Sequence, residues 1–200
     1  EIIIVDDHSK DGTIEIITSL IKDEKISAYF HDSNLGKGAA IQTALQYVTG
    51  DITIIQDADL EYDPADYNNL LLPFFEANAD VVYGSRFLGG GKYIRVHFFW
   101  HYLANKILTF VCNLFINLNL TDMETGYKVF KKDVIKNIRI HSNGFEIEPE
   151  ITAKISKNKK LNIFEVPITI YSRTHEEGKK VRWWDFFIYI YTLIKWRIFK

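Results

Sequence analysis

The sequence predicts an α/β fold in which a mainly parallel sheet is flanked by helices. Short apolar runs typical of buried strands alternate with helix-like segments through the first 90 residues. Apolar residues make up 47% of the 200-residue chain, which favours a folded domain with its own core and excludes a disordered chain. Polar clusters follow three of the predicted strands, at the edge where such sheets bind ligands.

Four strands and three helices are expected in this first part. The strands cover EIIIV, ISAYFH, DITIIQ and ADVVYGSR, which begin at residues 1, 26, 51 and 79. The helices cover residues 14–22, the segment that begins with the glycines of NLGKGAA, and PADYNNLLLPFFEAN, which Pro73 interrupts. Glu1 leads directly into a strand-like run without a preceding methionine, so we expect the native protein to start upstream with a further strand.

Two long apolar segments follow residue 90. In residues 98–120 a polar side chain recurs at every fourth position: His101, Asn105, Thr109, Asn113 and Asn117. This stripe argues against a membrane span and favours a helix on the core or at a membrane surface. Residues 183–200 combine Trp, Tyr, Lys and Arg, as helices at membrane interfaces do, and a terminal helix packed on the sheet is the alternative.

Charge is distributed unevenly along the chain. Residues 1–127 hold 8 Lys and Arg against 18 Asp and Glu, and residues 128–200 hold 16 against 8, so balances of −10 and +8 give the net charge of −2. This asymmetry indicates two tasks, one site that faces two partners, or solvated charge on helices. No nucleic-acid recognition motif is present, so no nucleic-acid partner is expected. The single Cys112 excludes a disulfide framework and a cysteine zinc site.

The acidic run IIQDADLEYDP at residues 54–64 is the strongest candidate site. Its four acidic residues alternate with uncharged ones, so an extended backbone would place all four carboxylates on one face. Such crowding is unfavourable without a cation, and carboxylate oxygens suit hard divalent cations. The predicted ligands of Mg²⁺ or Mn²⁺ are Asp57, Asp59 and Glu61. A solvated acidic loop is the alternative.

Two further polar clusters follow strands. In VDDHSKDGT, one of the carboxylates of Asp6 and Asp7 can accept hydrogen bonds from a nucleobase while the other orders the turn. The alternative is that the segment only caps the next helix, through Asp7, Ser9 or Thr13. In NLGKGAA, Gly36 lets the backbone approach a ligand, and Lys37 offers that ligand a positive charge.

The order of these motifs resembles that of glycosyltransferase family 2. The segments are IIIVDDHSKDGT, NLGKGAA, QDADLEYDP, DVVYGSR, ETGYKVF and EVPITIYSRTHEEGKK, and together they extend over essentially the whole chain. SRTHEEGKK is most similar to the polyprenyl-phosphate branch, which includes the dolichyl-phosphate mannose and glucose synthases. The resemblance implies a GT-A fold, a nucleotide-sugar donor, a divalent metal and inversion at the anomeric carbon. The amino-terminal strand of the family, with its P-x-Y-N-E signature, is absent from this sequence.

The resemblance also implies roles for individual residues. Asp6 resembles the base-contacting aspartate, Asp57 and Asp59 resemble the metal and diphosphate aspartates, and Glu61 stands where the branch often has glutamine. The residues expected to bind the nucleotide sugar are Asp6, Asp7, Gly36, Lys37 and Asp57. Those expected to bind the acceptor phosphate are Arg86, Arg173, Lys179 and Lys180. The catalytic set is expected to be Asp59, Arg86, Arg173 and Lys180.

We therefore expect an inverting transfer of a hexose from a UDP- or GDP-sugar to a polyprenyl phosphate. The protein would lie on the cytoplasmic face of a membrane, peripheral or C-terminally anchored, as one domain, residues 1–200. Residues 1–90 would bind donor and metal, and residues 91–200 would face acceptor and membrane. A phosphate acceptor is already an anion, whereas a glycan or glycolipid hydroxyl would need a base, for which Asp122 is the candidate. A catalytically silent nucleotide-binding module is the remaining alternative.

Overall fold

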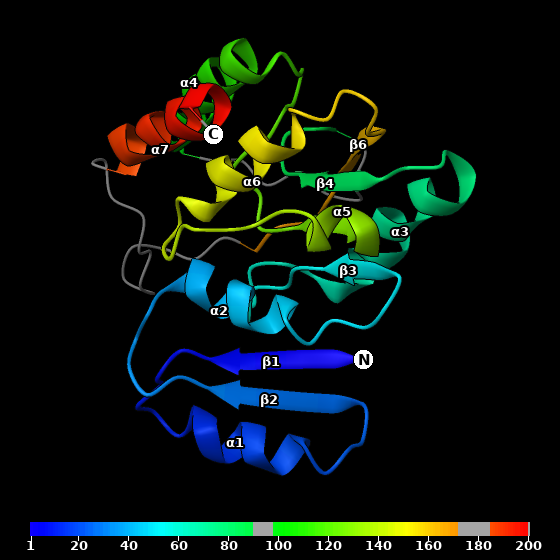
Figure 1. Ribbon diagram of the computed structural model, residues 1–200, viewed down its shortest axis with the longest axis vertical. Helices are drawn as coiled ribbons and strands as arrows, with labels where there is room; N and C mark the ends of the chain where they lie inside the picture. The colour runs from blue at the N-terminus through cyan, green and yellow to red at the C-terminus, as the bar shows by residue number, and fades with distance from the viewer. Residues whose placement is uncertain (90–97, 172–184, 200) are drawn as a thin grey trace.

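The computed structural model describes residues 1–89, 98–171 and 185–199 (Figure 1). The first part of the chain contains β1 (Ile2–Asp6), α1 (Thr13–Leu20), β2 (Ile26–Phe30), α2 (Lys37–Leu45), β3 (Ile52–Ile54), the 3-10 turn η1 (Pro64–Asp66), α3 (Tyr67–Glu76) and β4 (Val81–Ser85). The second part contains α4 (Phe99–Ile116), β5 (Lys128–Lys131), α5 (Lys132–Lys136), α6 (Ile147–Ile155), β6 (Ile163–Pro167), α7 (Asp185–Ile194) and the π-helical turn η2 (Lys195–Phe199).

The strands form two sheets. β1 and β2 pair in parallel, and the second sheet has the order β3-β5-β4-β6, in which β4 and β6 are parallel. The expected α/β architecture with parallel pairs is present, but the second sheet is mixed. The difference arises from β5, which the sequence pattern did not predict and which runs antiparallel between β3 and β4. Its position brings the ETGYK motif beside the carboxyl end of β3.

The four-stranded sheet is buried on both faces because its side chains alternate between two cores. Val81 and Tyr83 of β4 face the larger core, formed with α4, α6 and α7, whereas Val82 faces the core beneath α3. This two-sided burial explains why DVVYG reads as a continuous apolar run without alternation. The sheet thus lies as a layer between α3 and the three helices at the top of Figure 1.

Two residues of the polar stripe of helix α4, Thr109 and Asn113, contact the segment that follows the helix. Asn113 Nδ2 donates to the carbonyl of Leu120 at 2.8 Å, and Asn113 Oδ1 accepts from the Leu120 amide at 3.0 Å. Thr109 Oγ1 accepts from the amide of Met123 at 3.3 Å. These two side chains therefore satisfy backbone groups that burial would otherwise leave unpaired. No helix in the described part of the chain is long and apolar enough to cross a membrane.

The terminal helix packs on the core through one face. Tyr189 and Leu193 of α7 and Trp196 of η2 are buried against α4 and α6. The sequence predicted an interfacial helix or a terminal helix packed on the sheet. The observed helix packs on α4 and α6, and a role at a membrane interface stays a prediction. The outer faces of α4 and α7 nevertheless remain apolar and exposed: Phe99, Trp100, Ile107, Phe110, Leu114, Phe187, Ile188 and Tyr191.

Candidate functional site

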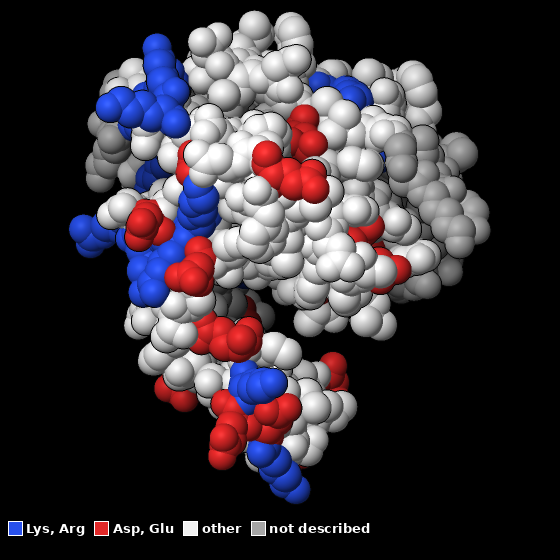
Figure 2. Space-filling view, turned by 90° about the vertical axis from the view of Figure 1, so that its right-hand side faces the viewer, with Lys and Arg blue, Asp and Glu red and all other residues white. Residues whose placement is uncertain are grey.

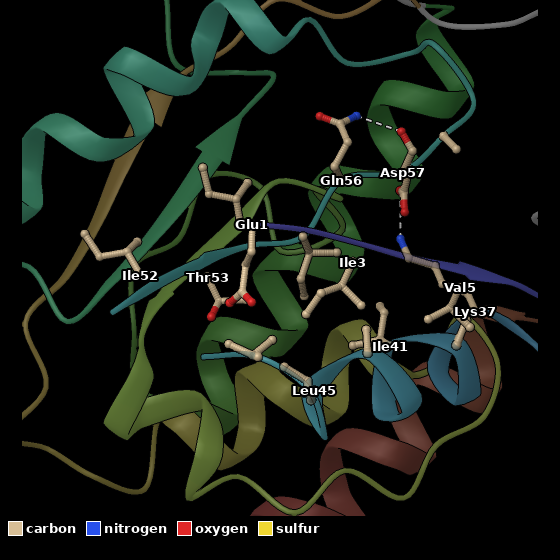
Figure 3. Close-up of a pocket in the computed structure, with 16 residues that line it drawn as sticks. Glu1, Ile3, Val5, Lys37, Ile41, Leu45, Ile52, Thr53, Gln56 and Asp57 are labelled. Carbon is tan, nitrogen blue, oxygen red and sulfur yellow. Dashed lines mark hydrogen bonds and ion pairs between the residues drawn. The ribbon is translucent and has the colours of Figure 1, made fainter. Parts of the chain in front are cut away.

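A cavity of about 310 Å³ lies between β1 and β3, against α2 (Figure 3). Apolar side chains of these three elements line most of it, and Lys37 and Asp57 close one end. Within the described residues β1 pairs with β2 alone and β3 with β5 alone, so the cavity separates two strand edges that lack a neighbour. Its apolar part is therefore a gap between strands, and the chemistry of the site belongs to its charged end.

Four charged side chains meet at that end. Lys37 Nζ, at the start of α2, lies 2.8 Å from Asp57 Oδ2 and 2.9 Å from Glu148 Oε1. The other oxygen of Glu148 pairs with the fully buried Lys128, at the start of β5. Burial raises the pKa of Asp57 even though Lys37 opposes it, whereas in Glu148 the effect of burial is outweighed by Lys128 and Lys37, which lower the pKa. The cluster joins β3, α2, β5 and α6 in one ion-pair chain.

The acidic run does not form the expected extended face. Leu60 has a left-handed backbone with φ 62°, and Asp59 Oδ1 accepts from the amide of Glu61 at 3.1 Å, so the chain turns after Ala58. Asp63 instead caps η1 by accepting from the amide of Ala65 at 2.9 Å. The prediction of one carboxylate face is wrong because the alternation belongs to a turn and not to a strand.

The predicted trio of metal ligands is not assembled either. No group of three or more His, Cys, Asp or Glu is placed to hold a metal among the described residues, so Glu61 does not complete the set. Asp57 and Asp59 are still close enough for the charge of Asp59 to raise the pKa of Asp57. Two such carboxylates fit Mg²⁺ or Mn²⁺, because these ions commonly take one or two carboxylates and complete their shell with phosphate oxygens and water.

Asp7 holds the loop before α2. Its carboxylate accepts from the amides of Leu35 at 2.8 Å and Gly36 at 2.7 Å, and from His31 Nδ1 at 2.7 Å. Burial raises the pKa of Asp7, but these hydrogen bonds outweigh it and keep the pKa below its ordinary value. Both oxygens are thus engaged within the protein, which gives Asp7 a positioning role, and the expected nucleotide contact stays a prediction. His31 was missed by sequence reasoning, since its partner lies 24 residues away.

Asp6 is also held by a hydrogen bond within the protein. Its Oδ2 accepts from the amide of Ser9 at 3.0 Å, and the side chain is buried at the carboxyl end of β1. This hydrogen bond orders the turn, as one of the two readings of VDDHSKDGT expected. The contact to a nucleobase that the resemblance implies stays a prediction.

The glycines of NLGKGAA are required by close packing. Gly36 has φ 101°, and a Cβ there would lie 2.4 Å from the carbonyl oxygen of Asn143; at Gly38 it would lie 2.2 Å from that of Ser142. The amide of Ala39 donates to the Asn143 carbonyl at 3.1 Å. The glycines therefore let α2 dock on this loop, which sets Lys37 in the charge cluster. The expected approach of the backbone to a ligand at Gly36 stays a prediction.

Arg86 and Asp122 form a two-pronged ion pair. Arg86 Nε and Nη2 each lie 2.6 Å from an oxygen of Asp122, and the Arg86 amide donates to Asp122 Oδ2 at 3.0 Å. Burial would lower the pKa of Arg86, but the charge of the fully buried Asp122 raises it instead. Glu165 accepts from the amides of Thr121 and Asp122 and so fixes this loop. Asp122 therefore orients Arg86, and an arginine on both its oxygens does not suit it to act as a base.

Glu124 is the second acid of the TDMETGYK motif. Its Oε1 is enclosed and has no hydrogen-bond partner among the described residues. Burial, reinforced by the charge of Glu148, raises the pKa of Glu124 to about 8. The carboxyl group is thus mostly neutral at pH 7. Three other predicted residues, Arg173, Lys179 and Lys180, lie outside the described residues.

The model of the family described as Glycosyl transferase family 2 matches residues 1–139. The chain belongs to this family. The acidic run, the NLGKGAA loop and Arg86 all lie within the matched part, so the resemblance read from the motifs is confirmed. Arg173, Lys179 and Lys180 lie beyond it.

Three curated relatives extend the family match to a branch. A dolichol-phosphate mannosyltransferase of Pyrococcus furiosus is 27% identical over 98% of this chain and 55% of its own length. A UDP-N-acetylglucosamine–dolichyl-phosphate N-acetylglucosaminyltransferase of Methanococcus voltae is 32% identical, and an undecaprenyl-phosphate mannosyltransferase of Micrococcus luteus is 29% identical. These two matches cover 86% and 90% of this chain and 75% of each relative. The chain thus spans between about half and three quarters of the length of these relatives.

Solved structures confirm the predicted GT-A-like fold. Glucosyl-3-phosphoglycerate synthase of Mycobacterium tuberculosis, in complex with Mn²⁺, uridine-diphosphate and phosphoglyceric acid, superposes with a TM-score of 0.68 at 18% identity, over 100% of this chain and 68% of that one. Mannosyl-3-phosphoglycerate synthase of Rubrobacter xylanophilus gives a TM-score of 0.67 at 19% identity, over 98% and 61%. At these identities the likeness establishes the fold alone.

Proposed function

We propose that this family 2 protein transfers a hexose from a UDP- or GDP-sugar to a polyprenyl phosphate. The observation that carries the proposal is the Arg86–Asp122 pair, which presents a fixed guanidinium and removes the candidate base. A phosphate acceptor is already an anion and needs an arginine more than a base. The three curated relatives, whose names specify dolichyl or undecaprenyl phosphate, support the same acceptor class.

In the proposed reaction, an acceptor phosphate oxygen bonds to the anomeric carbon as the bond to the nucleoside diphosphate breaks, which inverts that carbon. Asp57 and Asp59 would hold a divalent cation, and this ion supplies neutralisation of the diphosphate leaving group. Lys37, beside Asp57, adds a positive charge on the same side of the site. Arg86, fixed by Asp122, binds the acceptor phosphate. Arg173, Lys179 and Lys180 belong to the same proposed acceptor site by their resemblance.

Replacement of Asp59 tests the function. In membranes that contain the full-length protein, Mn²⁺, radiolabelled UDP- and GDP-hexoses and a polyprenyl phosphate, we expect label to move into the lipid fraction. Asp59→Ala is expected to reduce that transfer about a hundredfold, the usual effect of removing one electrostatic stabiliser. Asp63→Ala is the matched control, because Asp63 stands in the same acidic run but only caps η1. Failure of every donor to label lipid would refute the proposal, as would full activity of Asp59→Ala.

We further propose that the protein works as a peripheral protein at the cytoplasmic face of a membrane, through the outer faces of α4 and α7. Figure 1 places both helices at the top of the molecule, and the upper part of Figure 2 is mostly uncharged, with basic side chains at its margin. Exposed aromatic and aliphatic side chains with Lys and Arg nearby suit a membrane interface. A lipid acceptor would then reach the site without leaving the bilayer surface.

The double variant Phe110→Glu with Leu114→Glu is expected to abolish sedimentation of the protein with anionic phospholipid vesicles. These α4 side chains are 62% and 67% exposed, so their replacement should leave the fold intact while placing charge where lipid is proposed to lie. Phe75→Glu is the control, since Phe75 is 77% exposed and belongs to α3, which Figure 1 shows apart from α4 and α7. Equal sedimentation of the double variant and the unaltered protein would exclude this face as the docking surface.

A further inference from the structure

The position of the Lys37 ammonium group has a consequence for cation binding. It lies 2.8 Å from Asp57 Oδ2, one of the two carboxylates proposed to hold a divalent cation. A lysine ammonium and a divalent cation both neutralise a carboxylate, and they repel each other. When a cation binds Asp57, Lys37 therefore has to leave Oδ2 or share this oxygen with the cation, which costs free energy because the two positive charges repel each other.

Glu148 decides what happens to Lys37 after such a release. Its Oε1 lies 2.9 Å from Lys37 Nζ, so the ammonium group keeps a charged partner when it no longer pairs with Asp57. Without Glu148, the half-buried Lys37 would lose its last carboxylate partner in the cluster, which is unfavourable. A shared lysine is thus easier to displace from Asp57 than a lysine with Asp57 as its single partner.

Lys128 keeps Glu148 in place. It is fully buried, pairs with the second oxygen of Glu148, and donates to the carbonyl of Met123 at 3.1 Å. Each carboxylate oxygen of Glu148 therefore has its own lysine. Glu148 itself lies in the first turn of α6, in a sequence context (GFEIEPE) that carries no recognisable metal or catalytic motif.

We propose that Lys37 and a divalent cation compete for Asp57, and that Glu148 is the positioning residue that sets the balance by holding Lys37 after it leaves. The inference rests on the proposed function, because it takes Asp57 and Asp59 as the cation site. It adds a role for Glu148 that acts through Lys37 and involves no contact with the substrate or the cation.

Mn²⁺ binding without nucleotide measures the competition directly. The free Mn²⁺ signal in electron paramagnetic resonance is followed as the full-length protein is titrated. Lys37→Met is expected to tighten Mn²⁺ binding about tenfold, because Asp57 loses its competitor, and Glu148→Gln is expected to weaken it about tenfold. A tenfold change corresponds to about 1.4 kcal/mol, close to the lower end of the range of about 1.5–3 kcal/mol for hydrogen bonds to charged groups. Lys37→Met binding Mn²⁺ no more tightly than the unaltered protein would overturn the proposal.

A double-mutant cycle separates this mechanism from the general field of a nearby charge. If Glu148 acts through Lys37, Glu148→Gln has no effect on Mn²⁺ affinity in the Lys37→Met background, whereas independent charges would give additive effects. Additive effects overturn the proposal. Lys37→Arg, which retains the charge, should bind Mn²⁺ like the unaltered protein. Asp80→Asn breaks a similar pair, with Lys131 at 2.9 Å, and should change nothing.

Thermal unfolding of each variant shows whether it is folded, and Lys37→Met with Lys37→Arg suffice if Glu148→Gln does not fold. The lipid-labelling experiment tests the proposed function separately. If the protein is active but Lys37→Met gains no Mn²⁺ affinity, the proposed competition is refuted and the proposed function stands. If the protein is inactive but Lys37→Met and Glu148→Gln shift the Mn²⁺ affinity in opposite, non-additive ways, the competition stands and the proposed function is refuted.

Discussion

Asp122→Asn is expected to destabilise the protein by about 3–5 kcal/mol, the cost of removing one partner from a buried ion pair. Asp122 is fully buried and accepts from Nε, Nη2 and the amide of Arg86, so the amide of asparagine would leave the buried guanidinium without a counter-charge. Urea unfolding at neutral pH measures the change. Stability within about 1 kcal/mol of the unaltered protein would show that Arg86 has another anionic partner. Asp133→Asn on α5 is the control for the stability prediction, since Asp133 is exposed and its loss should shift stability by less than about 0.5 kcal/mol.

The Asp122→Asn variant also tests the type of acceptor. Arg86→Lys keeps a positive charge but cannot form the two-pronged contact, so transfer to lipid should fall as it does in Asp122→Asn. Full activity of Arg86→Lys together with an inactive Asp122→Asn would instead favour a base and a hydroxyl acceptor.

Gly126→Ala is expected to reduce transfer about a hundredfold, because one methyl group would displace Asp57. A Cβ on Gly126 would lie 2.5 Å from Asp57 Oδ2 and 2.9 Å from the ring of Tyr62, both too close for ordinary contact. The amide of Gly126 also donates to Tyr62 Oη at 2.8 Å, which holds the neighbouring ring in place. A shift of about 1 Å in a catalytic group can cost a factor of this size. Lipid labelling measures it.

Stability should fall less than activity in this variant, by about 1–3 kcal/mol, because the strain of an added methyl group is local. Gly50→Ala is the matched control. Its Cβ would meet atoms no closer than 3.5 Å, so both stability and transfer should be retained. An unchanged transfer rate in Gly126→Ala would mean that Asp57 can move without harm, which would weaken its assignment to the cation site.

The strands and helices of the first 90 residues were predictable because each carries a local signal, but α3 runs through Pro73 without the expected interruption. β5 was missed because KVFK is short and bounded by lysines, and a lysine is rarely placed inside a core by pattern alone. Lys128 is nevertheless fully buried, since Glu148, 20 residues away, pairs with it. No periodicity in the sequence reports a partner at that distance.

In the candidate site, too, the residue types were predictable from the sequence but their partners were not. The acidic run and Lys37 were predicted from residue type and from their position after strands, and both lie at the site. Their partners depend on the tertiary fold: Lys37 reaches Asp57 across 20 residues, and Asp7 reaches the NLGKG loop across almost 30. The turn at Leu60 could not be foreseen either, because a leucine at φ 62° contradicts its own local preference.

Helix α4 has one face tied to the loop that holds Asp122 and another face open to the surroundings. The inner contacts of Thr109 and Asn113 and the outer side chains Phe110 and Leu114 share the same two turns. An inserted or deleted residue between Asn105 and Asn113 would rotate one part of the helix by about 100° against the other and misplace both faces together. The length of α4 is therefore constrained more tightly than its composition, and family members that retain both faces should vary in sequence here but not in residue number, which an alignment would check.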